Sequence, residues 1–441
     1  MSRVLLVQLR RFGAPGALLI LLAGTVSLFL ARGEWSGGWM SLAMSQRDYL
    51  MLLSPLALAI GAWLARREHR AKTAELFAGT PRPHHQRILL TLTAVGLAVT
   101  AAYLAVLAVS VPWIVTTASY LPGAVFGVVA VGVLVMLASA WIGLAMGRLL
   151  PSPATAPALA VAGFVVILAA PMGFKQDWLA VLASPTWGMN PFSEFQTVPL
   201  LVSAAQAILA LSLIVAAAVA ITASRWQTRA AAVLPVVLGL AVSLAVVPRD
   251  YNRIMIDPVA QELVCTDDAP RVCVGRVHSR LLPEITPKAR EALALLAKLP
   301  NAPTTVQEDT TNYLDENAVK AFDSEAVGFQ VDVDRNGHLA DADHLVNRLL
   351  WAGGANFTGC PQGNVSAVAR ASGAWLAGRP PVDDPFDAGV FDETGKPYTV
   401  TPEATVLWEN LRKLPEAEAL AKVAAVRKAG VECTDMSGLL E

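Results

Sequence analysis

Two long stretches of this sequence contain no charged residue, and they constrain the fold more than any other feature. They run from Leu89 to Val111 and from Gly123 to Met146. About 20 mostly apolar residues are enough for a helix to cross the hydrocarbon core of a bilayer. A chain in that core must satisfy its backbone hydrogen bonds internally, which favours helices. The sequence therefore predicts an integral membrane protein, and its 54% hydrophobic and 16% charged residues agree with this class.

Apolar stretches of suitable length recur through the first part of the chain. They predict seven transmembrane helices, at residues 14–31, 49–65, 88–111, 123–147, 156–173, 198–222 and 230–247. Beyond them the charge changes, because residues 1–247 hold 15 Lys/Arg and 6 Asp/Glu, whereas residues 248–441 hold 19 and 29. We therefore expect six spans within 1–229, a seventh at 230–247, and an acidic soluble domain at 248–441. The expected fold class is an α-helical transmembrane bundle followed by a soluble, mostly helical α+β domain.

The distribution of Lys and Arg predicts the orientation, because cytoplasmic loops carry an excess of these residues. With a cytoplasmic N-terminus, the inner segments hold twelve of them, and the outer loops hold only Arg32, Arg47 and Lys175. Seven spans then place the soluble domain outside the plasma membrane, as an extracytoplasmic domain.

All four cysteines lie in the expected outer domain, at Cys265, Cys273, Cys360 and Cys433. An even number of cysteines in an oxidising compartment favours disulfides. Three pairings are possible. Cys265 with Cys273 would close a short loop whose Pro270 favours a turn, and Cys360 with Cys433 would tie the last helices to the domain. The alternative is a zinc site, but no C-x-x-C or Cys/His spacing supports it.

A charged segment, ARREHRAKTAELFAGTPRPHHQR at residues 65–87, separates the second and third expected spans. Its first part predicts a short amphipathic helix, because Ala71, Ala74 and Phe77 fall on one face. Pro81 and Pro83 then prevent this helix from running straight into the next span. Two interpretations stay open. Basic residues can hold such a segment to anionic headgroups, or the apolar face docks on another protein.

This segment resembles the coupling segment of the membrane permease subunits of ABC-2 type ABC exporters, particularly the actinobacterial ones. That family has a basic start, followed by Glu, Leu, a hydrophobic residue, two further residues, Thr and Pro. The present sequence has Glu75, Leu76, Phe77, Thr80 and Pro81 in that order. The resemblance implies that a separate ABC ATPase subunit docks here, with coupling residues Arg70, Ala74, Glu75, Leu76, Phe77, Thr80 and Pro81.

Two further features bear on the resemblance. The family has a longer, partly helical and re-entrant outer segment between its fifth and sixth spans, and residues 174–197 occupy that place. An ordinary aromatic-rich loop is the alternative for this stretch. The chain departs from the family at its end, because a six-span permease keeps both termini in the cytoplasm, whereas this chain adds a span and a large domain.

Energy for transport would have to come from another chain. The sequence contains no G-x-x-x-x-G-K-[ST] loop for ATP phosphates, so we expect neither enzymatic activity nor a cofactor. The expected spans hold no charge well inside them, which argues against an ion-coupled carrier. Gln206 is their main polar residue, and we expect it to hydrogen-bond between helices. The expected partners are the ATPase, the lipid bilayer and a second copy or a related permease, with no nucleic acid.

One stretch of the outer domain has the spacing of a calcium loop. DVDRNGHLADAD places its candidate ligands at Asp332, Asp334, Asn336 and Asp343. A turn at Asn336-Gly337, with Asp341 capping the next helix, explains the same residues without a metal. Catalytic motifs are absent from the sequence, and His278, His338 and His344 fit surface histidines better than bases.

Two classes of function follow from the sequence. The first is a permease subunit that exports a substrate with the help of a separate ATPase. The second is a membrane anchor that displays a disulfide-bonded binding or sensing domain. A membrane-embedded enzyme is a third class, but the first outer loop offers only the isolated Glu34 and Asp48.

Overall fold

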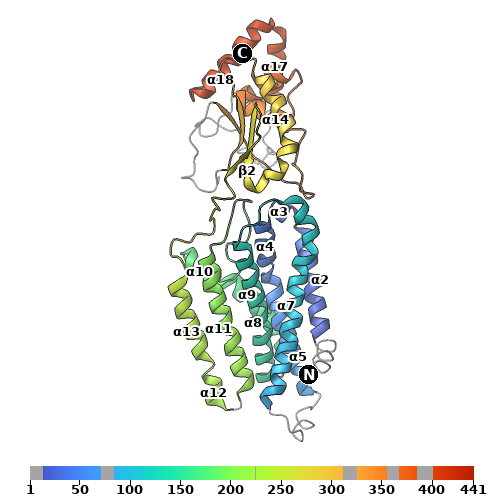
Figure 1. Ribbon diagram of the computed structural model, residues 1–441, viewed down its shortest axis with the longest axis vertical. Helices are drawn as coiled ribbons and strands as arrows, with labels where there is room; N and C mark the ends of the chain where they lie inside the picture. The colour runs from blue at the N-terminus through green and yellow to red at the C-terminus, as the bar shows by residue number, and fades with distance from the viewer. Residues whose placement is uncertain (1–12, 71–83, 224, 311–324, 355–366, 385–400) are drawn as a thin grey trace. The chain divides into compact units, whose positions relative to one another are not determined.

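The computed structural model describes residues 13–70, 84–223, 225–310, 325–354, 367–384 and 401–441. The chain divides into two compact units, Met1–Asp257 and Pro258–Glu441, and Figure 1 labels their elements. Residues 248–257 belong to the first unit. Their backbone meets the 174–197 segment, where Thr197 donates to the carbonyl of Met255 over 2.8 Å. The Tyr120 hydroxyl also donates to Asp257 over 2.8 Å.

The first unit is built from helices that run side by side (Figure 1). Their bounds are α2 Ala14–Leu30, α3 Arg32–Trp35, α4 Trp39–Asp48, α5 Leu50–Arg70, α7 His84–Thr117, α8 Ala124–Leu149, α9 Thr155–Met172, α10 Asp177–Ala183, α11 Leu200–Thr222, α12 Trp226–Ala230 and α13 Val233–Val246.

Five helices of the described chain are long and apolar enough to cross a membrane, namely α7, α8, α9, α11 and the α12–α13 segment. A sixth candidate is the pair α4 and α5, which bends by 46° between Asp48 and Leu50. The first expected span corresponds to α2, which has only 17 residues. The structure thus supports a helical membrane part with five or six candidate spans, and the expected count of seven is not confirmed.

The expected first outer loop is not a loop in the structure. It folds into α3 and α4, and α4 is buried along most of its length from Met40 to Arg47. The sequence misleads here because Ser45, Gln46 and Arg47 suggest a hydrated connection, whereas they face the interior of the helical unit. The 174–197 segment is partly helical, as expected, because it contains α10.

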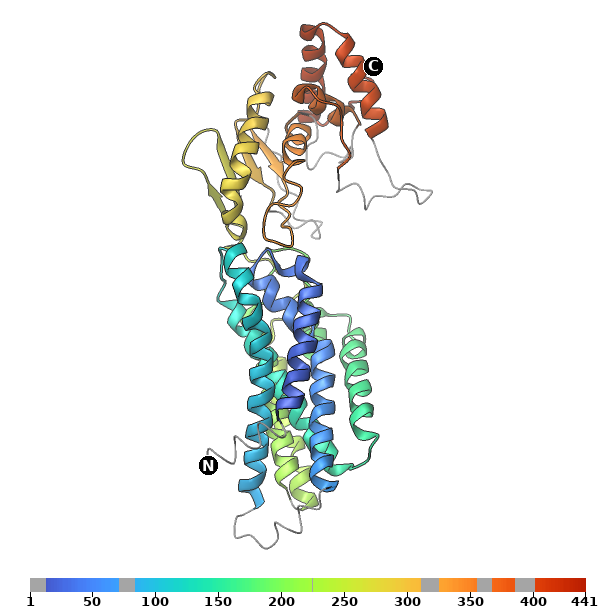
Figure 2. The ribbon, with the colours of Figure 1, turned by 90° about the vertical axis from the view of Figure 1, so that its right-hand side faces the viewer.

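The helices α5 and α8 approach each other more closely than ordinary side chains permit. A Cβ at Gly61 would lie 2.2 Å from the carbonyl oxygen of Ala140, and a Cβ at Gly143 would lie 2.1 Å from that of Leu58. Glycine at both positions lets the two backbones touch, as small residues do in membrane helix pairs. By contrast, α9 stands at the edge of the bundle (Figure 2), and only 6% of its apolar window is buried.

The second unit contains a sheet of four strands in the order β1-β2-β3-β4. The strands are β1 Leu263–Cys265, β2 Arg271–Gly275, β3 Thr305–Glu308 and β4 Ala326–Phe329. β1 is antiparallel to β2, and the other neighbours are parallel. The residue patterns of TTVQE (304–308) and VGFQVDV (327–333) predict strands, and these segments form β3 and most of β4.

Helices surround this sheet and share one hydrophobic core with it. They are η2 Arg276–Leu281, α14 Leu282–Leu296, α15 Leu345–Gly354, α16 Ala367–Ala377, α17 Thr401–Lys413 and α18 Glu416–Val431. The amphipathic segment TPKAREALALLAKLP predicts a helix capped by Thr286. The cap is wrong, because α14 begins four residues earlier and the Thr286 hydroxyl donates to the carbonyl of Leu282 over 2.6 Å. Pro283 in the first turn explains the earlier start, since proline suits that position.

Candidate functional site

The strongest candidate site in the helical unit centres on Arg47, in the last turn of α4. Its side chain is 0% exposed, although an arginine is rarely buried in this way. The helix carries it inward because every residue from Met40 to Arg47 is buried, so α4 has no solvent-facing side over this stretch. The bend into α5 follows directly, at Tyr49.

The Arg47 guanidinium is held by neutral groups from two other segments. Its Nε donates to the carbonyl of Pro185 over 3.0 Å, and its Nη2 donates to Oε1 of Gln206 on α11. Gln206 in turn donates to the carbonyl of Val181 on α10 over 2.7 Å. The expectation that Gln206 hydrogen-bonds between helices is therefore confirmed. No carboxylate of the described residues forms an ion pair with Arg47.

Several buried polar atoms on α4, α7 and α11 have no hydrogen-bond partner within the described part of the chain. They are Nη1 of Arg47 itself, the hydroxyls of Ser45, Tyr103 and Ser203, and Oε1 of Gln46. Buried polar groups are nearly always hydrogen-bonded, so these unpartnered atoms need an explanation. Four of the five atoms are donors, and one of them carries a positive charge.

Tyr103 on α7 and Ser203 on α11 both face α8. The Tyr103 hydroxyl lies in electrostatic range of the Arg47 guanidinium and fills the space beside Gly132, where a Cβ would lie only 2.1 Å away. Ser203 lies one turn before Gln206 on α11, and its side chain faces α8 at Gly127. The charge of Arg47 also reaches Tyr251, although burial has the larger effect and raises the pKa of Tyr251 to about 12.

Apolar residues surround this polar group. One core cluster of the helical unit contains three methionines, Met40, Met44 and Met189, together with Val181 and Val202. Methionine is flexible and polarisable, and it adapts to irregular shapes. The site therefore combines a fixed positive charge with walls that can repack.

Sequence reasoning missed Arg47 because it assigned the residue to an outer loop. A usable signal was present, since Met40, Ala43, Met44 and Arg47 recur at helical spacing and place Arg47 on an apolar face. The expectation of no charge well inside the seven spans did not extend to α4, because Arg47 lies just before the span expected at 49–65.

The coupling residues expected in the charged segment cannot be placed in the same way. Ala74, Glu75, Leu76, Phe77, Thr80 and Pro81 lie outside the described residues. Arg70 is the last residue of α5, and α7 begins at His84. Both helices thus continue beyond their expected apolar spans, on either side of the segment 71–83.

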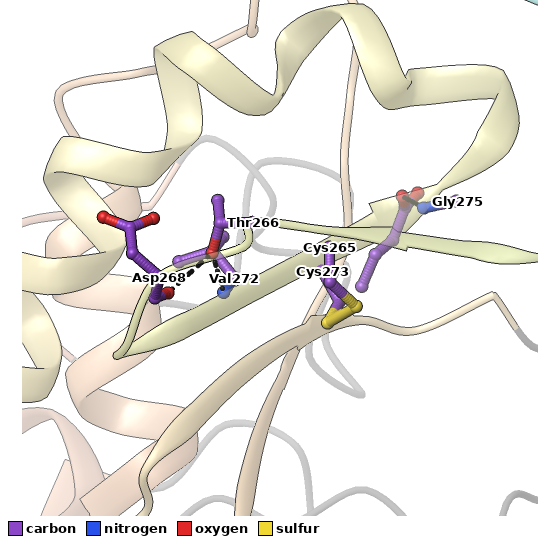
Figure 3. The surroundings of a disulfide bond; sticks show 7 residues. Cys265, Thr266, Asp268, Val272, Cys273 and Gly275 are labelled. Carbon is purple, nitrogen blue, oxygen red and sulfur yellow. Dashed lines mark hydrogen bonds between the residues drawn. A yellow bond between two sulfur atoms is a disulfide. The ribbon is translucent and has the colours of Figure 1, made fainter.

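The second unit contains the expected disulfide between Cys265 and Cys273 (Figure 3). The two residues are direct partners in the antiparallel pair β1–β2, so the bond joins adjacent strands. The connecting turn includes the cis peptide bond Ala269–Pro270. Cys433 is disulfide-bonded as well, and its expected partner Cys360 lies outside the described residues.

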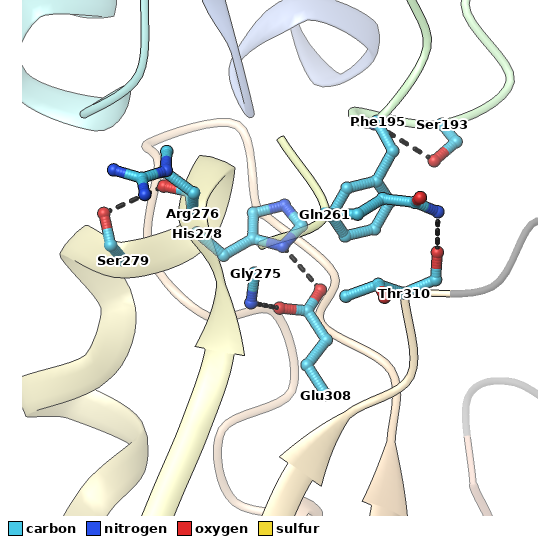
Figure 4. Close-up of polar contacts among 9 residues, drawn as sticks. All are labelled: Ser193, Phe195, Gln261, Gly275, Arg276, His278, Ser279, Glu308 and Thr310. Atoms are coloured by element: carbon cyan, nitrogen blue, oxygen red, sulfur yellow. Dashed lines mark hydrogen bonds and ion pairs between the residues drawn. The ribbon is translucent and has the colours of Figure 1, made fainter. Parts of the chain in front are cut away.

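A buried acid–base pair lies where β2 and β3 end (Figure 4). Glu308 receives a hydrogen bond from the backbone N–H of Gly275 over 2.6 Å, and its other oxygen lies 2.6 Å from Nδ1 of His278. Both side chains are almost fully buried. The expectation that His278 is a surface histidine is therefore wrong. The sequence hides this pair because its members are 30 positions apart on separate elements.

The calcium spacing at 332–343 forms a tight turn. Asp334 accepts hydrogen bonds from the backbone N–H groups of Asn336 and His338, over 2.7 and 2.9 Å. Gly337 has a φ of 82°, and Val333 pairs with Leu339 across the turn. Asp343 lies 3.4 Å from Lys288 instead. Asp341 has a φ of 50° and α15 begins only at Leu345, so Asp341 does not cap that helix as expected.

Comparison with models of protein families, with curated proteins and with solved structures finds no match for this chain. The inferences about function below therefore rest on the residues and their geometry.

Proposed function

We propose that this protein is the membrane-spanning permease subunit of an ABC-type exporter in the plasma membrane, driven by a separate ATPase that docks on residues 66–87. The observation that carries the proposal is the continuity of α5 and α7 with this charged segment. α5 runs as a helix to Arg70, and α7 starts as a helix at His84, so both spans extend into the segment. A push on residues 71–83 would act directly on two spans.

Packing within the helical unit would transmit a movement of α5 to other helices. α5 is in backbone contact with α8 at Gly61 and Gly143, so the two helices resist sliding or separating. At its other end α5 meets the bend at Tyr49, and Arg47 lies just before that bend. Movement of α5 would therefore change the surroundings of Arg47, which is how docking at one side of the membrane would reach a site within it.

Charge and disulfide chemistry support the proposed orientation. Because Arg47 is buried in α4, only Arg32 and Lys175 remain in the expected outer loops, which increases the excess of positive charge inside. The disulfide Cys265–Cys273 suits an extracytoplasmic domain, since disulfides persist in oxidising compartments.

A second copy or a related permease would complete the pathway. α9 and the α12–α13 segment bury only 6% and 11% of their apolar windows within the chain. These surfaces face lipid in a single copy, and one of them would meet the second copy in the assembled exporter.

The decisive test is recovery of an ATPase with the full chain after solubilisation from its native host. We expect an ATPase to co-purify with the wild type and to be lost with Glu75→Lys plus Phe77→Asp. The matched control makes the same exchanges in the outer segment, Glu194→Lys plus Phe192→Asp, and should retain the ATPase. Absence of an ATPase from every sample, at equal expression, would refute the permease assignment.

That negative result would favour the membrane anchor, the second class of function. The observation on its side is that the second unit has a continuous hydrophobic core of its own and a disulfide. An anchor would also tolerate charge reversal throughout residues 66–79, because the segment would serve only to fix the orientation.

A further inference from the structure

We propose that Arg47 forms a binding site for an anionic group, a carboxylate or a phosphate, carried by a mostly apolar molecule within the helical unit. This inference rests on the proposed function where it identifies that molecule as the exported substrate. The binding itself is a property of this chain alone.

The first argument is the uncompensated charge. Arg47 is 0% exposed, and its two hydrogen-bond acceptors are the carbonyl of Pro185 and the amide oxygen of Gln206, both neutral. A buried charge without a counter-charge is strongly destabilising. In membrane segments an ionisable residue is rare and marks a functional site by default. An anionic ligand would supply the missing charge.

The second argument is the chemistry of the neighbouring atoms. Nη1 of Arg47 and the hydroxyls of Tyr103 and Ser203 are buried donors without partners in the described chain. They come from α4, α7 and α11, so no single helix explains them. A carboxylate or a phosphate dianion presents only acceptors, and guanidinium binds both through planar pairs of hydrogen bonds. The donors and the proposed ligand are therefore complementary.

The third argument concerns the rest of the ligand. Met40 and Met44 precede Arg47 on α4, and with Val181 and Val202 they belong to one buried apolar cluster. A hydrated ion would lose its water without gaining enough partners there, because burying an isolated charge is costly. A hydrocarbon chain would instead pack against these residues. The geometry thus favours an amphipathic anion over a free inorganic one.

A purely structural role for Arg47 is the competing explanation, and Tyr103 separates the two. Its hydroxyl has no hydrogen-bond partner in the described chain, so Tyr103→Phe removes no hydrogen bond within that part of the protein. The same change would remove one donor from a bound anion. If Arg47 has only a structural role, Tyr103→Phe should change neither stability nor ligand binding. If Arg47 binds an anion, Tyr103→Phe should weaken that binding.

The test measures binding of dodecanoate and of dodecyl phosphate to the purified full chain in a neutral maltoside detergent, by native mass spectrometry. Dodecanol is the neutral control ligand. We expect one anion bound per chain, with affinity reduced about tenfold by Tyr103→Phe, since a hydrogen bond to a charged group is lost. Arg47→Gln should abolish binding, and the exposed Lys175→Gln should leave it unchanged. Preference for one probe identifies the head group as carboxylate or phosphate.

Two results would overturn the inference: equal binding of dodecanol, or binding that survives both Arg47→Gln and Tyr103→Phe. Absence of any binding to the wild type would also overturn it. Because no ATPase is present in this experiment, its outcome is independent of the co-purification test. Binding without a recoverable ATPase would refute only the permease assignment, and an ATPase without binding would refute only the anion site.

Discussion

Glu308 shows how much one buried side chain can hold in place. Its carboxylate receives the backbone N–H of Gly275 and lies against Nδ1 of His278, so it ties the end of β3 to the end of β2 and the start of η2. His278 and Glu308 are both almost fully buried, so neither side chain can replace this interaction with a hydrogen bond to water. The pair thus holds together the ends of β2 and β3, at the point where η2 and α14 follow β2.

Removing this carboxylate should destabilise the second unit. We expect Glu308→Ala to cost about 2 to 5 kcal/mol, because two buried polar groups would lose their acceptor. Thermal unfolding of the purified full chain, recorded for the transition of the second unit, measures the change in its free energy of unfolding. Glu291→Ala, at an exposed position of α14, is the control and should be neutral within about 0.5 kcal/mol. An equal effect of both changes would contradict the assigned role.

Asp334 gives a prediction about pH. Desolvation raises its pKa, but hydrogen bonds from the backbone N–H groups of His338 and Asn336 outweigh this effect, so the pKa lies below its ordinary value of 3.8. A carboxylate with a lowered pKa stabilises the folded state above the ordinary value and loses this contribution as the pH falls through the lowered one. We expect wild type to melt above Asp334→Asn at neutral pH, and the difference to disappear as the pH falls through the lowered pKa. A difference that is the same at every pH would contradict this account.

At the scale of single elements, the helices α5 and α8 are the most closely packed pair described above. Glycine at Gly61 and Gly143 is required by space, because a Cβ would collide with backbone rather than with a movable side chain. The collision cannot be relieved by a change of rotamer, so one helix would have to shift. Close backbone contact of this kind makes the pair behave as one rigid element.

Adding a methyl group should therefore separate the two helices. We expect Gly143→Ala to lower the free energy of unfolding by about 1 to 3 kcal/mol, as overpacking does. Gly123→Ala, at the residue that immediately precedes the same helix, is the control, because no atom lies within 4 Å of the added group. Melting of both variants in detergent measures the effect, and the prediction fails if the two variants melt together.

The elements differ in how well the sequence predicts them. Long uncharged runs such as 123–147 predict α8 closely, because hydrophobicity and length alone specify a span. The short α4 escapes prediction, since Ser45, Gln46 and Arg47 suggest a hydrated loop and only tertiary packing buries them. Similarly, the pair His278–Glu308 depends on the register of β2 and β3, which no local pattern reveals.

At the scale of the whole molecule, the proposed orientation in the membrane can be tested at the two ends of α9. Ser152 precedes this helix and Lys175 follows it, and both side chains are exposed. The proposed orientation places Ser152 in the cytoplasm and Lys175 outside. A single cysteine at either position reports its side, because no free cysteine competes in the described part of the chain.

We expect Lys175→Cys to react with a membrane-impermeant maleimide in intact cells, and Ser152→Cys to react only after the membrane is permeabilised. Labelling of the denatured protein is the control that both cysteines are reactive. The reverse pattern would invert the proposed orientation and would place the disulfide Cys265–Cys273 in a reducing compartment, where such bonds are rare.

The contact between α5 and α8 also has a consequence for how this sequence can change over generations. A larger residue at Gly61 or Gly143 would have to be accepted together with a shift of the partner helix, because either Cβ meets backbone. In related chains these two positions should therefore stay glycine, while the apolar residues of α9, few of which are buried within the chain, should exchange for one another more freely. Related sequences should therefore vary mainly on the outer surface of the bundle and should be conserved where α5 contacts α8.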